Sequence, residues 1–328
     1  MILLNQPLFI ISLDFEKMWG VFDKRTISSY GENIANVEQV IDRLLALFEK
    51  YDIHCTWATV GMLFHHNIQS CKNKFPIVLP QYANSNLSSY MHLKEISSND
   101  FGIYYSGIAS INKISKVPNQ EIATHTYSHF YCLEEGSSVD AFSKDLEMAV
   151  NISKQNGFET NSIVFPRNQY DKTFLEICSK MGLKAYRGTE LSWVQRSRNQ
   201  NELKSIHRVI RFIDSYINIT GANIYKQLEI NDQQLINVPA SFFLRPFNPK
   251  LFFFESVKIR RIKNSMFRAA REGSLFHLWW HPHNFGENLE ENMCQLESIL
   301  IYYSELKTKY GMLSRTMNEV ANEYSYGK

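Results

Sequence analysis

Short apolar runs alternate with segments of helical periodicity along most of the chain. Runs of about four to eight apolar residues are typical of buried parallel strands, whereas apolar residues three or four apart are typical of amphipathic helices. The predicted strands are residues 8–13, 53–60, 121–124, 161–165, 183–186, 235–238 and 275–280. The predicted helices are residues 34–51, 139–155, 172–181, 256–272, 289–309 and 314–322. This alternation predicts an α/β fold with a parallel sheet, and we expect a β/α barrel.

The length of 328 residues suits one barrel domain that covers residues 1–328 and ends in closing helices at about 289–322. Residues 64–117 depart from the alternation because they are rich in Asn, Ser and Tyr and have weak periodicity. A connection of this length is uncommon in a compact domain unless it has a function. We expect an insertion over one face of the fold. Residues 189–234 contain helical spacing without clear boundaries.

Composition argues against several classes of protein. The chain has 35 basic and 33 acidic residues, and the net charge of +2 gives no reason to expect a nucleic-acid partner. The five cysteines are widely spaced without a CxxC pair, which is typical of reduced thiols. The apolar N-terminus lacks a basic region and a cleavage site, and no apolar run approaches about 18 residues. We therefore expect a cytoplasmic protein without a signal peptide or a transmembrane segment.

Ionisable side chains follow several predicted strands at the point where each strand ends. They are Asp14 and Glu16, His125 and His129, Arg167, and His281. The carboxyl ends of parallel strands share one face of a barrel, and that face carries the chemistry. The sequence therefore predicts that these side chains meet in an active site.

His125 and His129 are four residues apart, so on a helical turn they would share one face and could hold one metal ion. Two histidines and one carboxylate leave an open position for water. Asp14 and Glu16 are two apart and would face the same way on an extended backbone, so one could bind the metal while the other serves as a base. The alternatives are a polar start of a surface helix for the histidines and a helix cap for Asp14.

Two further positions could complete an amide-hydrolysing site. His281 is placed to protonate a leaving amine, and Arg167 could keep Asp14 ionised through a charge-assisted hydrogen bond. A structural histidine packed on a tryptophan and a plain salt bridge are the alternatives. His277 lies within an apolar strand and is predicted to be a core residue, and His283 is predicted to be structural.

Four motifs resemble those of the NodB-like polysaccharide deacetylases, carbohydrate esterase family 4. In order, they are Ser12-Leu-Asp-Phe-Glu16, His125-Thr-Tyr-Ser-His129, Phe165-Pro-Arg-Asn-Gln-Tyr170 and Leu278-Trp-Trp-His-Pro-His283. The second motif matches the family pattern His-Ser/Thr-x-x-His in full. The resemblance implies a distorted (β/α) barrel of seven parallel strands. It also implies metal-dependent removal of an N-acetyl or similar N-acyl group from an amino sugar in surface-polysaccharide biosynthesis.

Carried over by position, the resemblance implies a role for each motif residue. Asp14 resembles the catalytic base, Arg167 the residue that orients the base, and His281 the catalytic acid. A divalent metal, with Zn²⁺ first and other first-row metals as alternatives, is expected on Glu16, His125 and His129. Oxyanion and substrate contacts are expected at Gln169, Tyr170, Trp279 and Trp280.

Two features depart from the family pattern. The family has adjacent acids in its first motif, whereas Phe15 occupies the second place here and Glu16 is the next acid. The family also supplies an aspartate that tunes the acid histidine, but the chain has no Asp after Asp232. Asp214, or a glutamate, is the alternative partner for His281.

The expected substrate is an amino sugar or glycan, either nucleotide-linked or lipid-linked, and the oligomeric state is open. Candidate glycan contacts in residues 64–117 are Tyr82, Tyr90, Tyr104 and Tyr105, and a capping segment without a ligand is the alternative. Two other functions stay open. One is a metal-independent, allantoinase-like amidohydrolase, and the other is a non-catalytic glycan-binding protein on the same fold.

Overall fold

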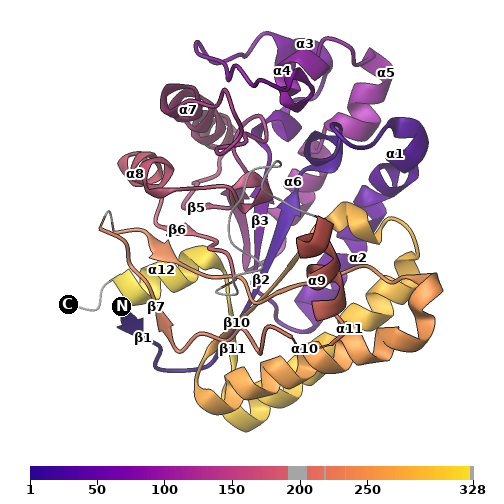
Figure 1. The fold of residues 1–328 in the computed structure, drawn as a ribbon, viewed down its shortest axis with the longest axis vertical. Coiled ribbons are helices and arrows are strands. Elements are labelled where there is room, and N and C mark those ends of the chain that lie inside the picture. The colour runs from indigo at the N-terminus through magenta and orange to yellow at the C-terminus, as the bar shows by residue number, and fades with distance from the viewer. Residues whose placement is uncertain (191–204, 218, 233, 326–328) are drawn as a thin grey trace.

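A sheet of parallel strands, curled into a distorted barrel, forms the centre of the protein in the computed structural model, which describes residues 1–190, 205–217, 219–232 and 234–325 (Figure 1). All strand pairs of this sheet are parallel. The hydrogen-bonded order is β8 (Ile236–Asn237), β6 (Ala185–Tyr186), β5 (Ser162–Ile163), β4 (Gln120–Thr124), β3 (Cys55–Thr59), β2 (Leu8–Phe15), β10 (Leu275–Trp280) and β9 (Phe242–Phe243). A further strand, β11 (Leu313–Arg315), pairs with β2. The expected distorted (β/α) barrel is confirmed.

The segment from β8 to β9 joins the two ends of this sheet. The Val238 N–H donates to the Tyr186 carbonyl at 2.9 Å, whereas the Leu244 N–H donates to the Trp279 carbonyl at 2.8 Å. The segment therefore leaves β6 and then runs beside β10. Gly188, just after β6, allows β8 to pass close by, since a Cβ at this position would lie 2.1 Å from Asn237 Oδ1. If β8 and β9 are counted as one kinked strand, the sheet has seven strands along its main path and β11 beside β2 as an eighth, one more than the expected seven.

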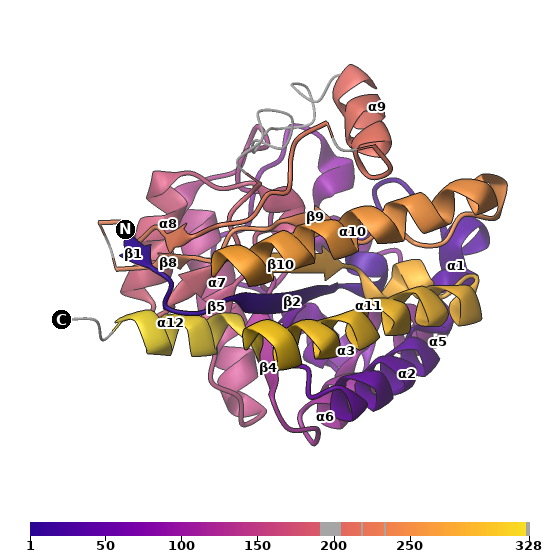
Figure 2. The same cartoon turned by 90° about the horizontal axis from the view of Figure 1, so that it is seen from below.

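Helices cover the outside of the barrel (Figures 1 and 2). They are α2 (Val37–Lys50), α7 (Val139–Gln155), α8 (Lys172–Lys180), α10 (Phe252–Glu272), α11 (Leu289–Tyr310) and α12 (Met317–Ser325). Amphipathic spacing explains their placement, because α2 buries Val40, Ile41 and Leu44 on one face. The helix expected at 34–51 is instead two helices, α1 (Ile27–Ala35) and α2. They separate at Asn36, whose amide donates to the Gly286 carbonyl at 2.9 Å.

Residues 64–117 form short helices rather than an irregular loop. They are α3 (Ile68–Lys72), η3 (Ser85–Leu87), α4 (Ser89–His92), α5 (Ser98–Asp100), the π-helical turn η4 (Phe101–Tyr105) and α6 (Ile108–Ile114). The expectation that their tyrosines contact a glycan is wrong for Tyr90 and Tyr105. Both are buried, and their hydroxyls bond to Asp145 and His92. Tyr82 uses its hydroxyl to accept the Tyr131 N–H at 2.8 Å, and only Tyr104 stays partly exposed without such a bond in the described structure.

The remaining elements are short. They are β1 (Ile2–Leu3), which pairs antiparallel with β7 (Gln227–Leu228), α9 (Ser205–Asp214), and the 3-10 turns η1 (Lys17–Gly20), η2 (Gly61–Phe64), η5 (Pro166–Asn168), η6 (Pro249–Leu251) and η7 (Pro282–Phe285). Helix α9 provides part of the helical structure expected in residues 189–234, and residues 191–204 lie outside the described part.

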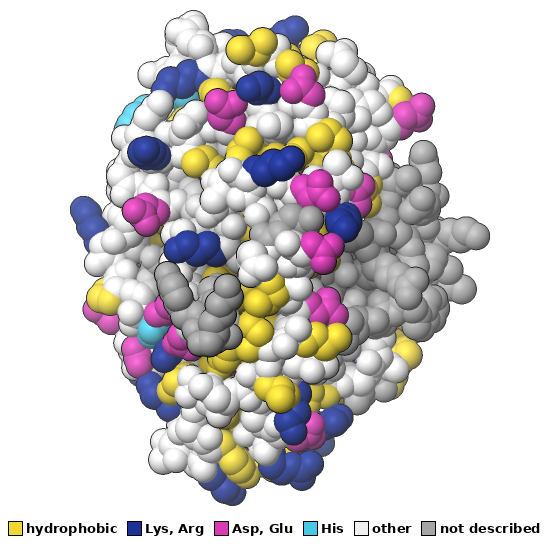
Figure 3. Space-filling model, turned by 90° about the vertical axis from the view of Figure 1, so that its left-hand side faces the viewer, with side chains coloured by type: hydrophobic (Ala, Val, Ile, Leu, Met, Phe, Trp, Pro, Cys, Tyr) yellow, Lys and Arg dark blue, Asp and Glu magenta, His cyan; other side chains and the backbone are white. Residues whose placement is uncertain are grey.

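The distribution of surface charges and the state of the cysteines agree with what the composition predicts. Acidic and basic side chains are interspersed over the face that forms the left-hand side of Figure 1 (Figure 3). All five cysteines are free, as expected. Among the described helices, none has the length and apolar character needed to cross a membrane.

Candidate metal and catalytic site

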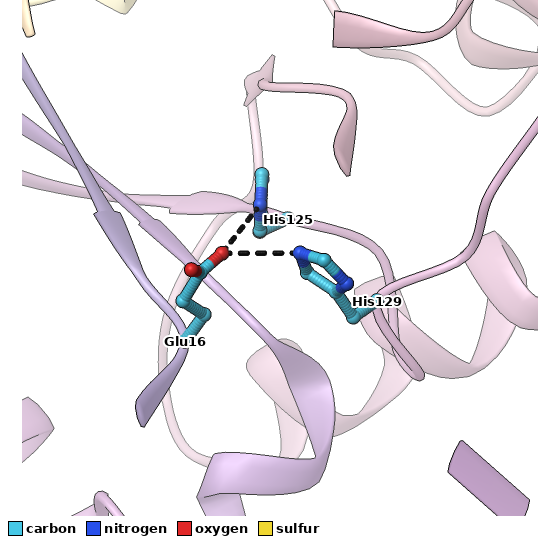
Figure 4. A group of neighbouring side chains, drawn as sticks. All are labelled: Glu16, His125 and His129. Atoms are coloured by element: carbon cyan, nitrogen blue, oxygen red, sulfur yellow. Dashed lines mark hydrogen bonds and ion pairs between the residues drawn. The ribbon is translucent and has the colours of Figure 1, made fainter. Parts of the chain in front are cut away.

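Glu16, His125 and His129 converge at the carboxyl ends of β2 and β4 (Figure 4). The Glu16 Oε2 atom lies 3.3 Å from His125 Nε2 and 3.0 Å from His129 Nε2. All three residues are buried, and one ligand atom from each lies within 4.8 Å of the others. Within the described residues, this is the one such group of three or more His, Cys, Asp or Glu side chains. The expected set of three metal ligands is therefore brought together.

The loop between the two histidines does not form the expected helical turn. Thr126 and His129 have left-handed backbone angles, with φ of 64° and 59°. The buried carboxylate of Asp145, from α7, accepts the Tyr127 N–H at 2.7 Å and the Ser128 hydroxyl. Hydrogen bonds to a side chain of another element, and not a helical repeat, therefore set the loop that presents both imidazoles.

The hydrogen bonds of His125 suit a metal ligand. Its Nδ1 lies 2.8 Å from the Val164 carbonyl oxygen, which can only accept, so Nδ1 carries the proton. When the ring binds a metal, Nε2 supplies the lone pair, and it faces Glu16, as in metal-ligating histidines. Nitrogen and oxygen ligands lie about 2.0–2.2 Å from Zn²⁺, so a tetrahedral pair is about 3.4 Å apart. The observed separations of 3.0 and 3.3 Å are close to this value, and the donor set fits a divalent ion.

The protonation states of the cluster also suit a cation. Burial alone raises the pKa of Glu16, but the neighbouring His281, His125 and His129 outweigh burial and bring that pKa well below its usual value. Burial lowers the pKa of His129. An ionised carboxylate and a neutral imidazole are the forms that bind a metal.

Asp14 lies beside this cluster and forms a bidentate ion pair with Arg187. The Arg187 Nη1 donates to Oδ1 at 2.6 Å, and Nη2 donates to Oδ2 at 2.8 Å. Burial alone raises the pKa of Asp14, but Arg187, together with His125 and His281, outweighs burial and lowers it. The guanidinium also lies 4.2 Å from the centre of the Trp279 ring. Asp14 is therefore held ionised by an arginine that follows β6.

The expectation that Arg167 holds Asp14 is wrong. Arg167 Nη2 lies 2.5 Å from Asp23 Oδ2 and Nη1 lies 3.8 Å from Glu134 Oε1. These two carboxylates and the Tyr131 ring, 4.1 Å from the guanidinium carbon, hold Arg167 away from Asp14. Arg187 directly follows the strand predicted at 183–186, so the strand-end rule that selected the other residues could have found it.

His281 lies close to the carboxylates of Asp14 and Glu16. Its Nε2 is 3.7 Å from Asp14 Oδ2 and 3.6 Å from Glu16 Oε1. Its Nδ1 is 3.2 Å from Asn284 Nδ2, and Asn284 Oδ1 accepts the Tyr30 hydroxyl at 3.2 Å. The amide nitrogen donates to Nδ1, so a neutral His281 carries its proton on Nε2, facing the two carboxylates.

The partner of His281 is thus an asparagine and not an acid. Asp214, the alternative considered from the sequence, instead pairs with Arg261 at 3.0 Å. His283 stacks on His281 and lies 3.9 Å from Glu16 Oε1, with a pKa lowered to about 3 by burial. His283 is therefore a neutral neighbour of the site.

The expected oxyanion group is not formed by Gln169. Its backbone N–H donates to the Pro166 carbonyl at 3.1 Å, and its side-chain amide donates to Glu134 at 2.7 Å. The Tyr170 hydroxyl accepts the Thr189 N–H at 3.2 Å. Both residues support the loops around the site through these bonds.

Trp279 and Trp280, the two tryptophans expected to contact the substrate, differ in how far they are buried. Trp280 is wholly buried and stacks on Phe285, so a substrate role for Trp280 is wrong. Adjacent strand residues point to opposite sides, which places Trp279 on the other face. Trp279 is partly exposed and packs against His281, with ring centroids 5.7 Å apart. Trp279 therefore keeps its candidate role at the rim of the site.

Comparison with known proteins supports the fold. No family model matches the sequence, and no curated protein matches it. A putative polysaccharide deacetylase from Mycobacterium smegmatis superposes with a TM-score of 0.58 at 12% identity, over 99% of this chain and 95% of that one. A GH57-type branching enzyme from the hyperthermophilic archaeon Pyrococcus horikoshii has a TM-score of 0.54 at 9% identity, over 97% and 70%. Puue allantoinase has a TM-score of 0.53 at 10% identity, over 98% and 90%. At these identities the likeness shows the fold alone.

Proposed function

We propose that the protein is a metal-dependent hydrolase that removes an N-acetyl or similar N-acyl group from an amino sugar in surface-polysaccharide biosynthesis. One observation carries the proposal. Glu16, His125 and His129 point toward one another, and two groups suited to proton transfer, Asp14 and His281, flank them. The fold shared with the mycobacterial polysaccharide deacetylase supports a carbohydrate substrate.

Glu16, His125 and His129 would hold the divalent ion, with Zn²⁺ as the first expectation. When bound, the ion supplies a Lewis acid that polarises an amide carbonyl and makes water more acidic. Asp14 stays ionised because Arg187 donates two hydrogen bonds to it. The ionised carboxylate is then the base that takes a proton from the water attacking the amide carbon.

His281 would act on the leaving group. Because its Nδ1 accepts from Asn284, its proton lies on Nε2 and can pass to the amine as the carbon–nitrogen bond breaks. The proton that Asp14 took from the water passes to Nε2, which lies 3.7 Å from Asp14 Oδ2, so that both groups are restored. The products are a carboxylic acid and a free amine. Trp279 and Phe243 pack beside His281 and offer aromatic faces against which a sugar ring can stack.

A ring amide is the second candidate substrate, because Puue allantoinase shares the fold over nearly the whole chain. An allantoinase-like reaction without a metal would leave the convergence of Glu16, His125 and His129 without a use. The metal requirement therefore distinguishes the two reactions.

The test is acetate release from N-acetylated amino-sugar oligosaccharides by the purified protein. We expect hydrolysis that stops when a chelator removes the ion and returns when Zn²⁺ is added. Hydrolysis that persists in the metal-free protein would favour the allantoinase-like reaction. A metal-loaded protein that binds glycans without hydrolysing them would favour a binding function.

A further inference from the structure

Exposed apolar side chains are concentrated in two segments of the chain. Of the sixteen exposed large apolar side chains in the described residues, nine fall within residues 209–219 and 252–257. Single exposed apolar residues are normal, but a cluster of this kind marks an interaction surface. The members are Val209, Phe212, Ile213, Ile217, Ile219, Phe252, Phe253, Phe254 and Val257. We name this surface the α9–α10 patch.

The two segments lie side by side and form one surface. The Tyr216 hydroxyl, just after α9, donates to Glu255 at 3.1 Å. Asp214 at the end of α9 pairs with Arg261 of α10 at 3.0 Å. Figure 2 shows α9 beside the N-terminal half of α10. The three consecutive phenylalanines, of which Phe253 is 87% exposed, lie at the start of α10.

The charges at the patch favour an anionic partner. Its two acids are buried and neutralised, since Glu255 pairs with Lys258 at 2.5 Å and Asp214 pairs with Arg261. Lys250 lies two residues before Phe252, Arg260 lies three residues after Val257, and both are exposed. Among the described residues neither side chain has an ion-pair partner, so the surface combines apolar side chains with positive charge, unlike the mixed face in Figure 3.

The patch also adjoins the candidate site. The Phe243 ring lies 5.5 Å from the His281 ring. The Arg245 guanidinium lies 5.7 Å from the Phe243 ring and 5.4 Å from the Phe212 ring of the patch. A short series of contacts thus connects His281 to the exposed apolar surface.

We propose that the α9–α10 patch docks on an anionic lipid bilayer and that the site acts on an amino sugar carried by a lipid in that bilayer. Aromatic side chains enter the interface between headgroups and acyl chains, while nearby Lys and Arg are attracted to anionic lipid. Docking places the His281 side of the site near the membrane. The statement about the substrate rests on the proposed function, whereas the docking does not. A second copy of the chain is a poorer occupant, because a symmetric contact would bring the same positive charges together.

The docking test is co-sedimentation of the full chain with vesicles of phosphatidylcholine alone or mixed with phosphatidylglycerol. We expect binding to the mixed vesicles that falls with added salt. The variants Phe253→Ser/Phe254→Ser and Lys250→Glu/Arg260→Glu should each weaken it by about tenfold or more. Ile77→Ser is the matched control, because Ile77 is 93% exposed and outside the patch.

Two results would overturn the docking: no sedimentation with phosphatidylglycerol vesicles, or equal sedimentation of the wild type and both patch variants. A concentration-dependent dimer that Phe253→Ser/Phe254→Ser abolishes, without vesicle binding, would assign the patch to a second copy. Capture of a protein partner by the patch, again without vesicle binding, would assign it to that partner. Circular dichroism of each variant verifies that the fold is kept.

The substrate is tested separately, by comparing hydrolysis of an N-acetylated glycolipid in vesicles with hydrolysis of a soluble oligosaccharide. Phe253→Ser/Phe254→Ser should slow the first reaction and leave the second unchanged. Equal rates of the variant and the wild type on the glycolipid would refute a lipid-borne substrate. Vesicle binding without any hydrolysis would contradict the proposed function but not the docking, and His129→Gln should bind vesicles as the wild type does.

Discussion

Asp14 and Arg187 form a bidentate ion pair in which both side chains are at most 5% exposed. They are far apart in sequence, at the ends of β2 and β6, and they meet because these strands belong to one barrel. Removing one partner of a buried pair leaves an uncompensated charge and costs about 3–5 kcal/mol. The pair therefore links the stability of the fold to the ionisation of the proposed base.

The first prediction concerns this pair. We expect Arg187→Met to lower the free energy of unfolding by about 3–5 kcal/mol and to abolish hydrolysis. Arg167→Met should leave Asp14 paired and retain more activity. The measurements are urea unfolding and acetate release. If Arg167→Met were inactive and Arg187→Met fully active, the assignment of the two arginines would have to be reversed.

The second prediction separates metal binding from proton transfer. Glu16→Gln and His129→Gln should each weaken metal binding by roughly 10–100-fold or more, because each replaces a carboxylate or imidazole ligand with a neutral amide, which is a weaker ligand. Asp14→Asn should keep the metal and lose hydrolysis, because its amide cannot serve as a base. Titration with a metal indicator and a rate assay on the same preparations would test both. Loss of the metal in Asp14→Asn, with retention in Glu16→Gln, would exchange the roles of the two acids.

The third prediction concerns Asp145, whose buried carboxylate shapes the histidine loop. Burial raises its pKa to about 6 from the usual 3.8. Between about pH 4 and pH 6 the folded protein therefore binds a proton that the unfolded chain has lost. This contribution to stability is fully present below about pH 4 and is lost as the pH rises through about 6. At about 1.4 kcal/mol per pKa unit, it is on the order of 3 kcal/mol.

Asp145→Asn should remove this contribution. The difference in the free energy of unfolding between the wild type and the variant should change by up to about 3 kcal/mol from pH 4 to pH 7. Asp140→Asn is the control, because Asp140 is exposed on the same helix. A difference that does not vary with pH would show that Asp145 keeps an ordinary pKa. We also expect weaker metal binding in Asp145→Asn at pH 7, where the loop loses an acceptor.

The fourth prediction concerns the orientation of His281. Asn284→Leu keeps the approximate shape of the side chain but removes the donor to His281 Nδ1. We expect kcat to fall by about 10–100-fold, less than the roughly 10²–10⁴-fold that proton transfer itself contributes, because His281 is misoriented but still present, while KM and metal content stay unchanged. Tyr30→Phe, which acts on Asn284 through one hydrogen bond, should have a smaller effect of the same kind. A change in KM alone would place Asn284 in substrate binding.

The sequence predicts elements best where local periodicity and local caps agree. Helix α7 and strand β10 have the predicted bounds, residues 139–155 and 275–280. Ser138 caps α7 by accepting the Ala141 N–H at 3.1 Å, and this cap is visible in the sequence. Strand β8 falls within the strand predicted at 235–238, whereas β9 could not be foreseen, because hydrogen bonds to a different neighbour define it.

The candidate site likewise has one part that the sequence predicts and another that it does not. The set Glu16, His125 and His129 is predictable, because each residue lies at or just beyond the end of a strand. The loop conformation between the histidines is not predictable, because the carboxylate of Asp145 on another element determines it. The rule that functional residues follow strand ends makes both Arg167 and Arg187 candidates, but only the barrel geometry shows that Arg187 is the one that reaches Asp14.

The central claim is that Glu16, His125 and His129 hold a divalent ion that hydrolysis requires. The most direct measurement is anomalous X-ray diffraction from crystals of the active protein, collected on both sides of the zinc absorption edge. We predict one anomalous peak within bonding distance of Glu16 Oε2, His125 Nε2 and His129 Nε2. Fully active protein whose crystals show no metal peak at these atoms would contradict the account.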